Sequence, residues 1–104
     1  MHKLRLNPLA KQDLIDIKEY ILTEFDNPSA AANVIKSIIK SYEKLKEFPM
    51  FGALLSSKID IKSDYKYLIS GEYIIFYKVE NPYVSIYRIL SYRRDYIKIL
   101  FKEV

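Results

Sequence analysis

Two of the three Asn-Pro pairs in this chain, Asn7-Pro8 and Asn27-Pro28, constrain its fold more than any other local feature. Asparagine is favoured just before a helix, and proline is favoured at the first helical position. After the first pair, apolar residues recur at spacings of three or four, which is the pattern of a helix with one buried face. These residues are Ala10, Leu14, Ile17, Ile21 and Phe25. A helix is therefore predicted from residue 8, with Lys11, Asp13 and Asp16 among the side chains that face water.

A second helix is predicted after Asn27-Pro28. Its apolar positions are Ala31, Val34 or Ile35, Ile38, Tyr42, Leu45 and Phe48. Pro49 should end this helix, because the residue before a proline avoids the helical conformation. Only a few residues separate the two patterns, and a short connection makes neighbouring helices antiparallel. The chain is therefore expected to form a helical hairpin, preceded by a short edge strand at residues 3–6.

From residue 65 onward the pattern becomes that of strands. Eight of the ten tyrosines lie between Tyr65 and Tyr96, and aromatic residues are enriched in strands. Strands are predicted at 65–70, 72–79 and 83–90, with tight turns between them and a closing helical turn at 96–101. Residues 53–63 fit either a weak strand or an ordered loop. The predicted fold is α+β, with the order β-α-α-β-β-β and a helical hairpin packed on a small twisted antiparallel sheet. Residues 1–104 are expected to form one domain.

Composition excludes several classes of site. The chain has no cysteine, which excludes disulfides and thiolate zinc sites and fits a reducing, cytoplasmic location. The one histidine, His2, lies near the N-terminus and does not support a catalytic triad. No apolar stretch approaches the ~20 residues of a membrane helix, and the first residues lack the apolar core of a signal peptide. We therefore expect no metal, no cofactor and no membrane contact.

Positive charge gathers in the second half of the chain, where residues 58–104 carry nine Lys and Arg against six Asp and Glu. A buried strand ends at Ser91 and leads directly into Arg93 and Arg94. Guanidinium groups on a rigid support suit the recognition of phosphate or carboxylate. The candidate target-binding residues are Lys66, Arg88, Arg93, Arg94, Tyr92 and Tyr96.

Each of these candidates also has a structural interpretation. The sheet face turned away from the hairpin is expected to carry Tyr and Lys as an open polar surface that could bind a ligand. Lysines on a sheet face are, however, often simply solvated. Arg88 interrupts an apolar strand and needs a partner, which one of several acidic residues could supply as an ion pair. The residues considered for that role are Asp60, Asp64, Glu72 and Glu80. Asp95 is expected either to pair with a neighbouring arginine or to cap the last helical turn.

Several motifs follow one another along nearly the whole chain. They are Asn7-Pro8 with its helix, Ala31-Ala32, Leu45-Lys-Glu-Phe-Pro49 with Gly52, Tyr73-Ile-Ile-Phe-Tyr77, and Ile89-Leu-Ser-Tyr-Arg-Arg-Asp95. Together and in this order, they resemble the RelE/ParE superfamily of bacterial toxins from type II toxin–antitoxin modules, the plasmid-stabilisation toxins. The resemblance implies growth inhibition, held in check by a cognate antitoxin in a hetero-oligomer.

The superfamily has two mechanistic branches. RelE-like members cut mRNA on the ribosome with basic residues and often a late tyrosine, whereas ParE-like members poison DNA gyrase. The long hairpin and the Leu-x-x-Phe-Pro-x-x-Gly pattern are similar to the ParE-like branch. Where the nuclease branch has a middle-strand arginine and its late tyrosine, this chain has Ile74 and Leu100. The ParE-like pattern in turn often has histidine in place of Ser91 and arginine in place of Lys66.

The leading hypothesis is therefore a ParE-like toxin that binds and poisons DNA gyrase and is not an enzyme. The alternative is a ribosome-dependent mRNA endoribonuclease, with Lys66, Arg94 and Tyr96 as its catalytic residues. A third hypothesis is a relative of the fold that binds its partner without being toxic.

Overall fold

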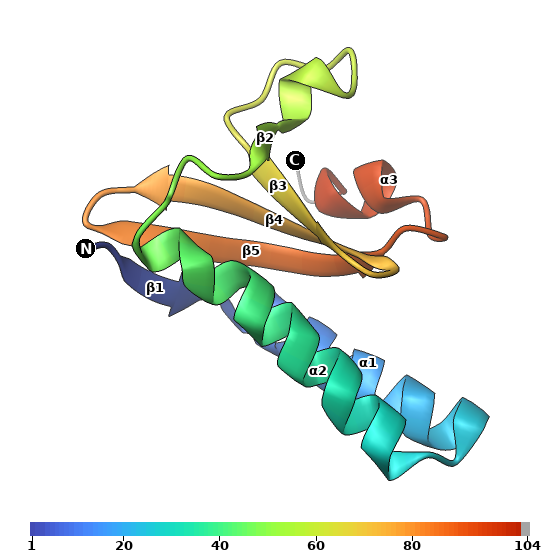
Figure 1. Cartoon of the computed structure of the whole chain (residues 1–104). Helices are drawn as coiled ribbons and strands as arrows, with labels where there is room; N and C mark the ends of the chain where they lie inside the picture. Colours follow the sequence, from blue (N-terminus) through green and yellow to red (C-terminus); the bar gives the residue numbers. More distant parts are fainter. Residues whose placement is uncertain (103–104) are drawn as a thin grey trace.

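The computed structural model describes residues 1–102, which form one five-stranded sheet with a long helical hairpin against it (Figure 1). The elements in chain order are β1 (Lys3–Leu6), α1 (Pro8–Phe25), α2 (Pro28–Glu43), η1 (Lys44–Lys46), β2 (Ala53–Leu54), η2 (Leu55–Ser57), β3 (Lys66–Ser70), β4 (Tyr73–Glu80), β5 (Tyr83–Ser91) and α3 (Tyr96–Leu100). The predicted α+β class and order of the main elements are confirmed. The ambiguous segment 53–63 contains both a two-residue strand and a short 3-10 turn. Within residues 1–102, no helix has the length and apolar character needed to cross a membrane.

Both helices of the hairpin begin at the predicted proline. The Asn27 side chain accepts a hydrogen bond of 3.0 Å from the Ala30 N–H and so caps α2. Asn7 makes no such side-chain bond, and its backbone N–H instead donates to the Ile86 carbonyl and prolongs the pairing of β1. α2 ends earlier than predicted and tightens into η1, a common way for a helix to finish. Phe48 therefore lies beyond the helix and is exposed.

The strand order in the sheet is β1-β5-β4-β3-β2. The predicted meander is confirmed, because β3–β4 and β4–β5 pair antiparallel through short turns. At the edge of the sheet, however, β1 runs parallel to β5, with Leu4 opposite Val84 and Leu6 opposite Ile86. The sheet is therefore mixed, where a wholly antiparallel sheet was expected. Nearly the whole chain separates β1 from β5, so no local turn pattern indicates their relative direction.

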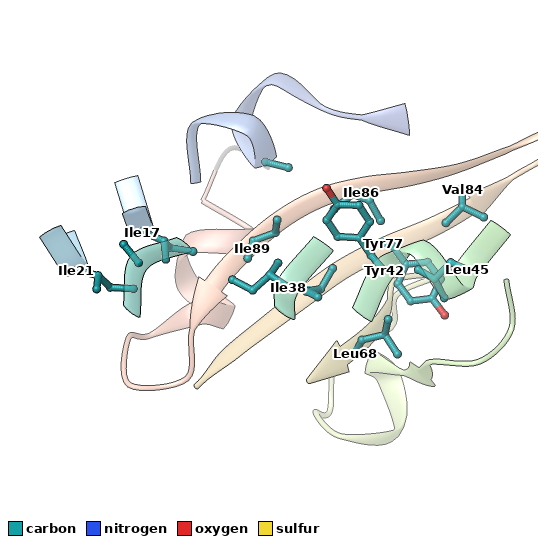
Figure 2. Packing of buried hydrophobic residues seen from close by; sticks show 13 residues of the cluster. Ile17, Ile21, Ile38, Tyr42, Leu45, Leu68, Tyr77, Val84, Ile86 and Ile89 are labelled. Carbon is teal, nitrogen blue, oxygen red and sulfur yellow. The ribbon is translucent and has the colours of Figure 1, made fainter. Parts of the chain in front are cut away.

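The main core lies between the hairpin and one face of the sheet (Figure 2). A β-bulge contributes to it, since the register of β4 against β5 shifts between Phe76 and Tyr77. The shift allows Ile86 and Ile89, three residues apart, to join the same core. The largest buried members contributed by the helices and η1 are Ile17, Ile21, Ile38, Tyr42 and Leu45. These positions match the predicted apolar stripes.

The opposite face of the sheet was expected to be an open polar surface of tyrosine and lysine. Instead it carries a second apolar cluster, in which Ile74 and Phe76 of β4 pack with Leu100 of α3. Figure 1 shows α3 and the hairpin on opposite sides of the sheet. The expectation of an open face is wrong because the C-terminal helix folds back over the strand that precedes it.

Candidate functional site

A buried ion pair between Asp13 of α1 and Arg88 of β5 joins the hairpin to the sheet. Arg88 Nε and Nη2 donate to the two Asp13 carboxylate oxygens, each at 2.8 Å. The Ile89 backbone N–H donates to Asp13 Oδ2, also at 2.8 Å. β1 ends at Leu6, which pairs with Ile86. Ile89 lies beyond the end of β1, and its N–H donates to the Asp13 carboxylate. The carboxylate thus supplies a buried acceptor where the strand pairing stops.

Asp13 was expected to face water and was not considered as the partner of Arg88. The first expectation is wrong because only 7% of Asp13 is exposed. The omission is also an error, because the Asp13 carboxylate is paired with Arg88. The sequence contained a usable signal for this. Asp13 lies three residues after Ala10 and four before Ile17, so helical spacing places it on the buried stripe. A charge at such a position requires a partner of opposite charge in the folded protein.

An apolar groove of about 890 Å³ opens between the hairpin and the end of the sheet. Figure 1 shows that the tip of the hairpin extends past the sheet, so the sheet does not cover its inner face there. Apolar side chains that line the groove are Ile17, Tyr20, Ile21, Phe25, Val34, Ile38, Tyr73 and Ile89. Tyr20 and Phe25 are largely exposed and meet edge to face, with their ring centres 6.3 Å apart. Such a groove fits an apolar segment of a partner protein.

The arginine turn lies at one side of this groove, and Arg93, Arg94 and Glu72 line it together. Arg93 Nη2 donates to Glu72 Oε1 at 2.8 Å, and both side chains are exposed, so this pair adds little stability. Over residues 1–102, no side-chain hydrogen bond or ion pair engages the exposed Arg94 guanidinium. Asp95 accepts from the Lys98 N–H and caps α3, which was one of its two expected roles. Arg94 therefore brings an available positive charge to an apolar groove.

Lys66 has a different setting, beneath the loop that joins η1 to β2. It is buried, and its Nζ donates to the Gly52 carbonyl at 3.2 Å. The Tyr77 hydroxyl accepts from the Gly52 N–H at 2.8 Å and donates to the Pro49 carbonyl at 3.0 Å. A Cβ on Gly52 would lie 2.5 Å from Tyr77 Oη and 2.6 Å from the Tyr67 carbonyl oxygen. Gly52 is thus required for this close approach of loop and sheet.

Tyr92 and Tyr96 belong to the aromatic cluster on the α3 side of the sheet. Their rings meet edge to face with centres 5.8 Å apart, and Tyr96 also packs on Phe76. Lys58 Nζ donates to the Tyr92 hydroxyl at 3.3 Å and lies over the Tyr67 and Tyr92 rings. The hydrogen bond to Tyr92 raises the pKa of Lys58. Tyr92 is therefore engaged in packing and in a cation–π contact, and Tyr96 in aromatic packing.

The predicted target-binding residues thus occupy different settings. Arg93 and Arg94 line the groove, Arg88 holds the hairpin, and Lys66 supports a loop. The sequence identified the basic residues but not the groove, which depends on how far the hairpin extends beyond the sheet. Within the described part of the chain, no group of three or more His, Cys, Asp or Glu side chains is placed to hold a metal ion.

Comparison with known proteins gives two findings. A family model described as the ParE toxin of the type II toxin–antitoxin system parDE matches residues 4–96. A solved structure of the chromosomal ParDE TA system from P. aeruginosa contains a similar chain, with a TM-score of 0.74. The two sequences are 19% identical, and the match covers 88% of this chain and 96% of the other, so this likeness shows a shared fold. No curated protein matches the sequence.

Proposed function

Because the chain belongs to the ParE toxin family of type II toxin–antitoxin systems, we propose that it inhibits bacterial growth by binding and poisoning DNA gyrase. We further propose that a cognate antitoxin neutralises it in the cytoplasm by forming a hetero-oligomer. The family match over residues 4–96 is the observation that carries the toxin assignment. The choice of gyrase over the ribosome rests on the residues that this chain has where the nuclease branch carries its middle-strand arginine and its late tyrosine.

Two of those positions are apolar and buried. Ile74 is fully buried in the cluster beneath α3, and Leu100 is buried in the same cluster. A nuclease needs a cation to stabilise the developing phosphate charge and a group that handles the proton. Neither side chain provides this chemistry. Both instead hold α3 against the sheet, which favours a protein that acts by binding.

The remaining candidates for nuclease chemistry are also poorly arranged for it. Lys66 is buried and directed to the Gly52 carbonyl, whereas Arg94 lines the groove beside the hairpin. Tyr96 packs among aromatic rings on the α3 side of the sheet. A phosphoryl-transfer site requires its charged and proton-transferring groups to converge on one atom. The three side chains lie in three separate settings, which supports the binding mechanism over the endoribonuclease.

We propose that the antitoxin occupies the apolar groove. An amphipathic helix laid along the inner face of the hairpin would cover Tyr20 and Phe25, which are exposed in the isolated chain. An acidic residue on that helix would pair with Arg94. This arrangement would remove exposed apolar surface and stabilise the toxin by linkage.

Controlled expression in a bacterial host, with and without the antitoxin gene, tests this function. Expression of the toxin alone should stop growth and induce the DNA-damage response, and co-expression of the antitoxin should restore growth. Codon-positioned cuts in translated mRNA would instead establish the endoribonuclease. Unimpaired growth at a high level of folded toxin would support the binding-only relative.

A further inference from the structure

The loop from Phe48 to Leu54 exposes four large apolar side chains within seven residues. Phe48, Met50, Phe51 and Leu54 are 61%, 67%, 61% and 49% exposed. Isolated apolar residues on a surface need no explanation, but a group of this density marks an interaction site. The second helix was expected to end at Pro49 with Phe48 among its apolar positions, and this expectation does not account for the exposure of all four side chains.

The backbone of this loop is fixed from below. Tyr77 bonds to both the Pro49 carbonyl and the Gly52 N–H, and Lys66 bonds to the Gly52 carbonyl. Tyr77 and Lys66 are themselves buried, on strands β4 and β3. The Phe51 N–H also donates to the Phe48 carbonyl at 3.0 Å. A loop held in this way presents its side chains with little loss of conformational entropy on binding.

The loop and the groove lie at opposite ends of α2. The α2 residues that line the groove lie between Ala30 and Ile38. The loop instead follows the C-terminal end of α2, after η1 (Figure 1). None of the residues 48–54 lines the groove. An antitoxin segment seated in the groove therefore does not by itself account for the exposed loop.

The charge around the loop indicates the character of its partner. Of the lysines nearest the loop, Lys66 is buried and Lys46 is paired with Glu43, whereas Lys44 is exposed. The Lys44 Nζ lies 5.7 Å from the centre of the Phe51 ring, so a cation directly borders the apolar side chains. A protein surface complementary to this loop has an apolar pocket edged by carboxylates.

We propose that the 48–54 loop is a docking element that inserts Phe48, Met50 and Phe51 into an acid-rimmed apolar pocket on the toxin's protein target. This inference rests on the proposed function, in which the toxin acts by binding a host protein. It adds a contact surface that is separate from the antitoxin groove. The loop's rigid backbone and its distance from the groove give the toxin two surfaces that can be disrupted independently.

The test compares Met50→Ser and Phe51→Ser with Ile15→Ser, a matched control. Ile15 is 49% exposed on α1 and lines neither the loop nor the groove. Each purified protein is assayed for its melting temperature, its affinity for purified gyrase and its affinity for the antitoxin, and each is assayed for growth inhibition. The loop variants should lose at least tenfold in gyrase affinity and lose growth inhibition, as expected for central apolar anchors. Their melting temperatures and antitoxin affinities should stay at the level of the control.

Several results would overturn the docking role. Loop variants that bind gyrase and arrest growth as strongly as the Ile15→Ser control would do so. So would a wild-type oligomer that the loop variants convert to a monomer without loss of toxicity, because the loop would then serve self-association. Failure of the proposed function is recognised separately, since the wild type itself would then neither bind gyrase nor arrest growth.

Discussion

Asp13 on the first helix and Arg88 on the last strand form a bidentate ion pair, with both N–O distances at 2.8 Å. Because the same carboxylate accepts the Ile89 N–H, one side chain fixes the position of α1 against β5. The groove is lined by residues from α1, α2 and β5, so its shape depends on this contact.

Replacing Asp13 by alanine should strongly destabilise the protein. The change removes the carboxylate that accepts from a largely buried guanidinium and from a backbone N–H, and breaking such a pair costs about 3–5 kcal/mol. Equilibrium urea unfolding monitored by circular dichroism measures the loss. Glu19→Ala, at an exposed position on the same helix, is the control and should change stability by less than about 0.5 kcal/mol. Equal effects of the two substitutions would contradict the structural role of Asp13.

The sequence predicted the hairpin well because its apolar residues recur with helical spacing and its starts carry prolines. It failed at Asp13 because a charged residue was assigned to water by its type, although its spacing matched the buried stripe. The face covered by α3 was also missed. Six residues at the end of a chain give a weak helical pattern, and nothing local indicates the surface against which they fold. The parallel pairing of β1 with β5 depends on a similarly distant contact.

Gly52→Ala should destabilise the protein and loosen the 48–54 loop. The new Cβ would lie within 2.7 Å of two Tyr77 atoms and of the Tyr67 carbonyl oxygen. A forced contact with backbone cannot be relieved by a rotamer change, so a loss of about 3 kcal/mol is expected.

Gly71→Ala provides the comparison for this prediction. Gly71 has a positive φ of 58° but open space around it, so alanine there should cost only backbone strain, about 1 kcal/mol. Urea unfolding of both variants measures the difference. If Gly52→Ala were the milder change, the hydrogen bonds of Tyr77 would not hold the loop as described.

Tyr20→Ser should weaken antitoxin binding without affecting the fold. Tyr20 is 56% exposed and lines the groove, so its removal takes apolar contact area from the complex but little from the isolated chain. Isothermal titration calorimetry with the purified antitoxin should show an affinity at least tenfold lower, in the range found for aromatic anchors. Ile15→Ser, outside the groove, should bind as the wild type does. Unchanged affinity in Tyr20→Ser would place the antitoxin elsewhere.

Stability should fall at alkaline pH, and Tyr87 should account for part of the fall. Burial, followed by the hydrogen bond to Glu80, raises the pKa of Tyr87 to about 12 from 10.0. A tyrosine with a raised folded-state pKa contributes its full stability below pH 10, and that contribution is lost as the pH rises toward 12. Burial also raises the pKa of Tyr42, Tyr65, Tyr73 and Tyr77. The stabilising contributions of these tyrosines should likewise be lost as the pH rises above 10.

Unfolding measured from pH 8 to pH 11 tests this assignment with Tyr87→Phe. The variant has no hydroxyl to ionise at that position, so its stability should decline less steeply above pH 10 than that of the wild type. Parallel curves for the two proteins would show that folding does not raise the pKa of Tyr87.

The most direct test of the gyrase mechanism combines purified toxin with purified DNA gyrase and relaxed plasmid in a supercoiling assay. The toxin should inhibit supercoiling and cause gyrase-cleaved DNA to accumulate, and added antitoxin should reverse both effects. Full supercoiling and no cleaved DNA, with toxin present in excess and shown to be folded, would contradict the gyrase mechanism.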